Sequence, residues 1–263
     1  MTKQGKIAVL TNFREEGVEL IEGARSRGEI PSAYLTVPPD RDESPEQFAY
    51  RLIEEDGVHG VGGFSLAFGQ LKRLAREGEE AGVLNFVSNR TPNVQGLKHS
   101  PRRGTWGLSN SHYGDRAWPK VVDGERLLGE VVQADTEGEQ ELDELIEKCF
   151  EVLSTDTLPK KDPDEEFQIY VRQLRHSIFI PAVGGDESGP KISADLLAAA
   201  REQTPMSKAT SGVYGTQRQT VILVDRLGKA TFVERTLYDG EANAVAETER
   251  DRRFDFDIEG WQD

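Results

Sequence analysis

Apolar residues in the first half of the chain gather in short runs of strand length. Such runs occupy residues 6–12, 63–70, 83–88 and 105–109. The first run is apolar at four successive positions, Ile7 to Leu10, which predicts an interior strand with a neighbour on each side. Residues 72–81 are charged and lie between glycines, so they predict a surface excursion within a hairpin.

Helical signals mark three other regions. Ser44, Pro45 and Gln47 have the pattern of a capping box with proline at the first helical position, which predicts a helix from Pro45 that Gly57 stops. Apolar residues recur every three or four positions at 127–132 and 140–153, with acidic residues on the opposite face. Residues 29–37 predict a short helix or turn.

The C-terminal part predicts a second group of strands. Residues 219–225 and 230–235 are β-rich and are separated by a short segment containing Gly228, which predicts a hairpin. The first arm is continuously apolar, so we expect it to be covered on both faces. Residues 253–258 alternate between apolar and acidic, which predicts a half-buried edge strand.

The order of these elements favours an α+β fold. Strands precede, enclose and follow the helices without a regular βαβ repeat, which favours two stacked antiparallel sheets with helices packed outside. We expect a single domain over residues 1–263, with exposed loops at 155–166 and 184–190, where the chain is polar and rich in loop-forming residues.

Composition narrows the classes of function. The net charge of −15, from 47 acidic and 32 basic residues, disfavours binding to nucleic acid. No run approaches the roughly 20 apolar residues of a membrane helix, so we expect no integral membrane segment. A single cysteine excludes an internal disulfide and suits a reducing compartment. We therefore expect a soluble, cytoplasmic protein without a targeting segment in the chain as given.

Few residues carry a recognisable reaction chemistry. No dinucleotide, phosphate-loop or nucleophile-elbow motif occurs in the right context. The four histidines are dispersed, so the sequence predicts neither a metal site nor a cofactor. Cys149 falls on the apolar face of a helix and is expected to be an inert core thiol. His112 lies near Ser109 and Asp115, but a hydrolytic triad is defined in space, and loop residues are the simpler interpretation.

Amide and hydroxyl side chains recur where the expected strands end. They occur at Thr11-Asn12, Ser88-Asn89-Arg90, Ser109-Asn110 and Tyr214-Gly215-Thr216. Such residues usually form turns by bonding their own backbone. If several converge on one rim, they line a polar pocket with donors suited to a carbonyl or an oxyanion. Both interpretations remain open at this stage.

Several short sequence blocks, some of which contain these residues, together resemble a known protein family. They are Lys6 to Asn12, Arg27-Gly28-Glu29, Gly62 to Leu66, Ser88-Asn89-Arg90, Gly104 to Asn110 with Trp118-Pro119-Lys120, and Tyr214-Gly215-Thr216 followed by Thr220 to Asp225 and Thr231 to Arg235. In order and approximate spacing they resemble the transport and Golgi organisation family, also called the NRDE-motif family. The resemblance covers residues 6 to about 240.

Two departures from the family pattern change what the resemblance implies. The family begins with Met-Cys and carries an Asn-Arg-Asp-Glu motif upstream of the Leu-Thr-Asn strand, so we expect an N-terminal segment with the first strands of the fold to be missing. Gln217 stands where the family often has arginine, with Arg218 one place later. The resemblance implies a four-layer αββα sandwich similar to N-terminal-nucleophile hydrolases. The nucleophile there would be the cysteine after the initiator methionine, and no residue of this chain fills that role.

The resemblance implies a role in Golgi organisation and protein secretion, with lipid homeostasis and haem transport associated with some members. We expect a non-catalytic protein, cytoplasmic and Golgi- or mitochondrion-associated. The alternatives are an amide hydrolase that uses the missing cysteine, and a carrier whose small ligand is haem or a lipid metabolite. Histidines leave axial haem ligation open. The pocket residues implied are Asn12, Asn89, Arg90, Asn110, Thr216 and Arg218.

Overall fold

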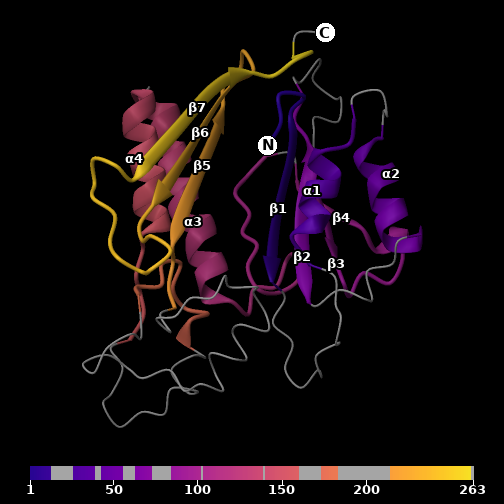
Figure 1. Ribbon diagram of the computed structural model, residues 1–263, viewed down its shortest axis with the longest axis horizontal. Coiled ribbons are helices and arrows are strands. Elements are labelled where there is room, and N and C mark those ends of the chain that lie inside the picture. Colours follow the sequence, from indigo (N-terminus) through magenta and orange to yellow (C-terminus); the bar gives the residue numbers. More distant parts are fainter. Residues whose placement is uncertain are drawn as a thin grey trace. The chain divides into compact units, whose positions relative to one another are not determined.

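The computed structural model (Figure 1) describes residues 1–12, 26–38, 43–55, 63–72, 84–101, 103–138, 140–159, 173–182 and 214–261. The chain divides into two compact units. The first comprises Met1–Asp115, Val224–Ala230 and Phe256–Asp263, and the second comprises Arg116–Leu223 and Thr231–Asp255. Our expectation of a single domain stays a prediction, as does the four-layer stacking.

The first unit contains a four-stranded antiparallel sheet in the order β1-β2-β3-β4. Its strands are β1 (Lys6–Asn12), β2 (Phe64–Gln70), β3 (Asn85–Ser88) and β4 (Lys98–His99). The register places Lys6 opposite Gln70 and Asn12 opposite Phe64. The strands predicted at residues 6–12, 63–70 and 83–88 are therefore confirmed.

Two short helices cover one face of this sheet. They are α1 (Glu29–Leu35) and α2 (Pro45–Tyr50), and α2 continues into a π-helical turn, η1 (Arg51–Glu55). The predicted capping box is present, since the Ser44 side chain accepts from the Gln47 amide and the Gln47 side chain accepts from the Ser44 amide.

An aromatic cluster joins the helices to the sheet. The rings of Tyr34, Phe48 and Phe68 meet with centroids 4.9 to 5.3 Å apart. Phe64, Leu66 and Phe68 alternate along β2 toward this core, as the period of two in a strand requires.

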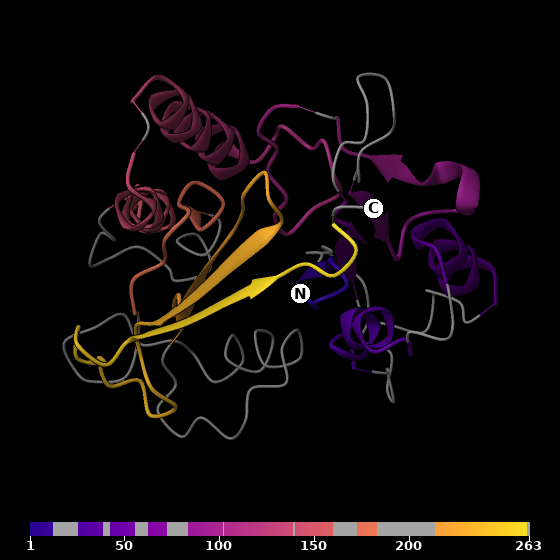
Figure 2. The ribbon, with the colours of Figure 1, turned by 90° about the horizontal axis from the view of Figure 1, so that it is seen from above.

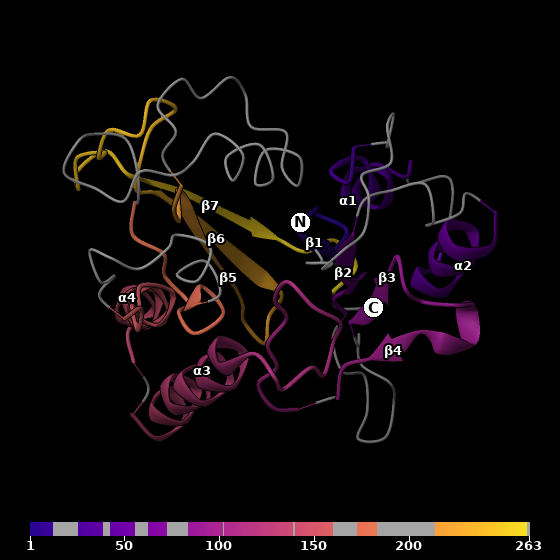
Figure 3. The same ribbon diagram turned by 90° about the horizontal axis from the view of Figure 1, so that it is seen from below.

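The second unit consists of a three-stranded sheet and two helices. The strands β5 (Arg218–Val224), β6 (Lys229–Thr236) and β7 (Asp251–Asp257) lie in the order β5-β6-β7. The helices α3 (Pro119–Gly138) and α4 (Leu142–Leu153) pack on the same face of the sheet (Figures 2 and 3). Their shared core consists of Ile146, Cys149, Phe150, Val221 and Val233. The predicted hairpin and helices are confirmed, and β7 is an edge strand as predicted, but it is mostly exposed instead of half-buried, with Phe254 57% exposed.

Three other strand predictions are wrong in detail. β1 is an edge strand of its sheet and Val9 is half exposed, so β1 is not flanked on both sides among the described residues. β5 also lies at an edge and alternates between exposed and buried positions at its start instead of being covered on both faces. Residues 105–109 form no strand.

Some expectations fall on other parts of the chain. Gly57, residues 73–81 of the excursion predicted at 72–81, and the loop at 184–190 lie outside the described residues, as does most of the loop at 155–166. Within the described part, no helix is long and apolar enough to cross a membrane.

Candidate functional site

Antiparallel pairing gathers several polar side chains at one end of the first sheet. β1 ends at Asn12, opposite Phe64 at the start of β2, and β3 ends at Ser88, opposite Ser65. The end of β1, the start of β2 and the end of β3 therefore share one end of the sheet. Asn12 and Asn89, which the sequence placed at two separate strand ends, are brought to this common end.

The segment of residues 109–111 is tied to the same end by side-chain hydrogen bonds. Thr11 Oγ1 donates to the Ser109 carbonyl oxygen at 2.8 Å, and Ser65 Oγ donates to the Ser111 carbonyl oxygen at 2.8 Å. Asn110 Nδ2 donates to the Asn12 carbonyl oxygen at 3.0 Å. These side chains hold residues 109–111 against this end of the sheet. We call Thr11, Asn12, Ser65, Asn89 and Asn110 the strand-end cluster.

Asn89 and Arg90 form the turn that follows β3. Asn89 Oδ1 accepts from the Phe64 amide at 3.3 Å, so its side chain fixes the start of β2. The Arg90 amide donates to Ser88 Oγ at 3.2 Å, while the Arg90 side chain is exposed. Asn89 thus belongs to the strand-end cluster, whereas Arg90 contributes its backbone to the turn.

Arg27 is a member of this region that sequence reasoning did not select as a pocket residue. Its Nη1 donates to the Gly63 carbonyl oxygen at 2.9 Å, next to the start of β2. Burial lowers the pKa of its guanidinium. Its place in the Arg27-Gly28-Glu29 block was the sequence feature that could have identified it. Ser65 was also missed, because a serine inside a buried strand resembles a core position.

A small cavity lies beside the cluster, between the sheet and the loop that follows Asn110. Its volume is about 40 Å³. Its polar lining comes from Ser65, Ser88, Thr91, Lys98 and His112. A space of this size holds one or a few water molecules, whereas pockets for small organic ligands measure roughly 300–1,000 Å³. The described cavity therefore suits water or a small polar group.

The hydrogen bonds of this loop test the possible triad of Ser109, His112 and Asp115. Ser109 Oγ donates to Asn110 Oδ1 at 3.2 Å, so the serine of that triad is directed to the amide and not to His112. The carboxylate of Asp115 accepts from Ser111 Oγ. Ser109, His112 and Asp115 are therefore loop residues, as the simpler interpretation held.

The two remaining predicted residues belong to the second unit. Thr216 Oγ1 accepts from the Ile180 amide at 2.9 Å, and the Thr216 amide donates to the Ile180 carbonyl oxygen at 2.8 Å. Arg218 forms an exposed ion pair with Glu234 at 3.2 Å. Thr216 fastens one backbone segment to another, and Arg218 pairs across neighbouring strands.

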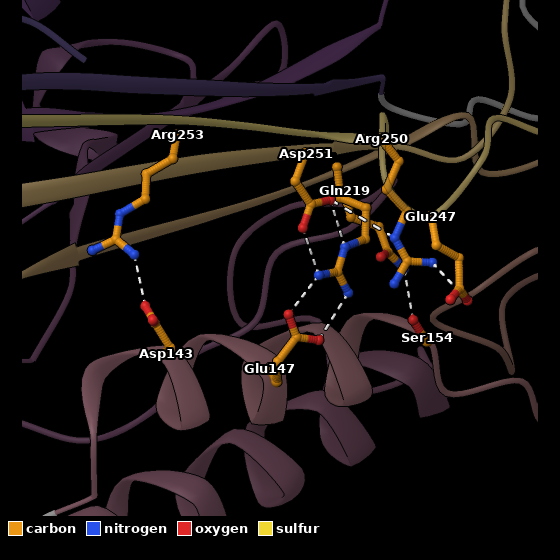
Figure 4. Close-up of polar contacts among 9 residues, drawn as sticks. Asp143, Glu147, Ser154, Gln219, Glu247, Arg250, Asp251 and Arg253 are labelled. Carbon is orange, nitrogen blue, oxygen red and sulfur yellow. Dashed lines mark hydrogen bonds and ion pairs between the residues drawn. The ribbon is translucent and has the colours of Figure 1, made fainter.

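The second unit also contains a buried arginine that sequence reasoning missed. The Arg235 side chain on β6 is 7% exposed and pairs with Glu147 of α4 at 2.6 Å and with Asp251 of β7 at 2.7 Å. Its Cζ lies 3.8 Å from the centroid of the Phe150 ring. Figure 4 shows Glu147 reaching from the helix toward the sheet. Arg235, Glu147 and Asp251 are called the Arg235 cluster below.

Hydrogen bonding shifts the pKa values within this cluster. The bond to Asp251 is the largest contribution that raises the pKa of Arg235 above its ordinary value. The same bond lowers the pKa of Asp251. The buried guanidinium is therefore matched by two carboxylates, and the cluster joins the helix to the sheet as a structural element.

The remaining chemistry of the described residues is limited. Cys149 is buried in the helical core, and burial raises the pKa of its thiol, in agreement with the predicted inert role. Among these residues no group of three histidine, cysteine or acidic side chains is placed to hold a metal ion.

Comparison with known proteins identifies the family of the chain. The sequence model described as Transport and Golgi organisation 2 matches residues 1–239. An uncharacterized protein of Saccharomyces cerevisiae is 24% identical over 98% of this chain and 80% of its own length. The Transport and Golgi organization protein 2 homologs of Bos taurus and Homo sapiens are each 29% identical, over 90% and 91% of this chain and 70% and 71% of their own lengths. The chain therefore belongs to the Transport and Golgi organisation 2 family.

Proposed function

We propose that this chain supports Golgi organisation and protein secretion without catalysing a reaction. The printed names of its mammalian relatives refer to transport and Golgi organisation, and the match to them extends over most of the chain. Association with the Golgi apparatus is part of the same proposal.

The hydrogen bonding of the strand-end cluster carries the non-catalytic part of the proposal. Thr11, Ser65 and Asn110 each donate to a backbone carbonyl oxygen. A catalytic hydroxyl is instead hydrogen-bonded to a base that activates it, and an oxyanion site needs donors aimed at the reacting group. The geometry therefore favours a cluster that fastens residues 109–111 to the sheet.

Replacement of the relative in cells tests the proposal. Human cells from which the Transport and Golgi organization protein 2 homolog has been removed are supplied with this chain, or with the human homolog as a positive control. We expect the chain to restore the rate of reporter secretion and Golgi morphology. Normal expression of the chain without any restoration, while the human homolog restores both, would contradict the proposed role.

The non-catalytic part has a separate test. The purified chain is incubated with a panel of amide and thioester substrates, and product formation is compared with buffer alone. We expect equal rates. Hydrolysis above the buffer rate that is lost in the Thr11→Val variant would replace this part of the proposal with an amide or thioester hydrolase.

A further inference from the structure

Two cationic side chains of the second unit share one aromatic ring. Lys120 Nζ lies 5.4 Å from the centroid of the Trp118 ring, and Arg175 Cζ lies 5.6 Å from it. The Lys120 amide donates to the Arg175 carbonyl oxygen at 3.2 Å, so the two backbone segments are held together. The backbone segments that carry the two cations are therefore adjacent.

Most of the other cations that the structure describes in this unit are paired with carboxylates. This holds for Arg116, Arg126, Lys148, Arg218, Arg235, Arg250 and Arg253. Among the ion pairs of the described residues, none includes Lys120 or Arg175. Acidic residues are abundant in a chain with a net charge of −15, yet these two partly buried cations, like the exposed Arg252, are absent from those ion pairs.

Both cations are also incompletely solvated. Arg175 Nε is buried and has no hydrogen-bond partner among the described residues, which is costly for an ionised donor. Burial lowers the pKa of the Lys120 amine to about 8. Both side chains are only partly buried, so an anion placed against their accessible donors would compensate the charge of both.

We propose that Lys120 and Arg175, beside Trp118, bind the phosphate group of a small molecule. A phosphate carries a charge between about −1.5 and −2 at neutral pH and presents several acceptor oxygens, which matches two cations better than a single carboxylate does. Arginine and lysine are the usual side chains for such a group. Because the Lys120 amide is already bonded to Arg175, the side chains and not the helix backbone make this site.

Amine labelling measures the proposed binding directly. The chain is acetylated with an activated ester at pH 7, with or without inorganic phosphate, and each lysine is quantified by peptide mass spectrometry. Only the neutral amine reacts, and each unit by which phosphate raises the Lys120 pKa lowers the neutral fraction about tenfold. We expect millimolar phosphate to slow the labelling of Lys120 at least about threefold on this basis. Lys148, already paired with Glu144, is the internal reference and should change little.

Salts and variants separate a specific site from general screening. Sodium chloride at equal ionic strength and acetate should each protect Lys120 far less than phosphate. Arg175→Gln should abolish the protection, Arg175→Lys should retain part of it, and Arg126→Gln on the exposed side of α3 should leave it unchanged. Glycerol phosphate in place of inorganic phosphate shows whether the ester form is preferred. Equal protection by chloride or acetate, or full protection in Arg175→Gln, would overturn the proposal.

Discussion

Two sets of substitutions break the same ion pairs of the Arg235 cluster but should destabilise the protein to different extents. One variant removes the cation, as Arg235→Met, and the other removes both anions, as Glu147→Gln with Asp251→Asn. The Arg235 side chain is 7% exposed, whereas Glu147 and Asp251 are 56% and 37% exposed. The carboxylates can therefore regain water when their partner is lost, but the guanidinium cannot.

The magnitudes follow from this difference in exposure. In Arg235→Met the thioether still packs against Phe150 and the two carboxylates are hydrated, so we expect a loss of about 1–3 kcal/mol in the free energy of unfolding. In the double variant a buried cation is left without a counter-charge, which costs about 3–5 kcal/mol, reduced in part by its contact with the Phe150 ring. The anion-free variant should therefore be the less stable of the two.

Urea unfolding followed by circular dichroism measures both free energies. Arg218→Met with its partner change Glu234→Gln provides a matched control, because this pair is exposed and should contribute less than about 1 kcal/mol. If Arg235→Met proved at least as destabilising as the double variant, the argument that burial of the guanidinium sets the cost would be refuted.

Three further predictions rest on other features. Because the Asp251 pKa is lowered in the folded state, the wild type should exceed Arg235→Met in free energy of unfolding by the full amount above about pH 4. This difference, measured by urea titrations, should decline as the pH falls through the lowered pKa of Asp251. A difference that stays constant with pH would contradict this. Gly228→Ala should lower the melting temperature, because Gly228 has φ +82 and a Cβ would lie 2.2 Å from Trp261 Cγ, whereas Gly240→Ala in open space should not; equal melting temperatures would contradict it. The Cys149 thiol should resist iodoacetamide at pH 8 in the native state and react in urea; rapid native labelling would contradict its burial.

The sequence correctly predicted those elements that a few adjacent residues determine. The capping box at Ser44 and Gln47 and the turn at Gly228 depend on a few adjacent residues, and both formed as expected. Edge position depends on which segments pair, so the apolar run in β1 did not reveal that Val9 is half exposed. Residues 105–109 have strand composition, but a strand also needs a partner segment, and none of the described strands pairs with them.

The candidate site was predictable only in part for similar reasons. Amides at strand ends indicated Asn12, Asn89 and Asn110, and the antiparallel register then brought them to one end of the sheet. Arg235 was not selected, although the predicted strand at 230–235 includes it. Its position two residues after Val233, on the inward side of β6, was the available signal for a buried ion pair.

The most direct test of the central claim joins the strand-end cluster to the cellular role. Thr11→Val removes the hydroxyl that holds Ser109 with almost no change in volume, and Thr220→Val is the matched control on the exposed side of β5. Reporter secretion is measured in human cells that lack the homolog and express each variant at equal level. The account predicts that wild type and Thr220→Val restore secretion and that Thr11→Val does not. Full restoration by Thr11→Val would show that the fastening of residues 109–111 is irrelevant to the function.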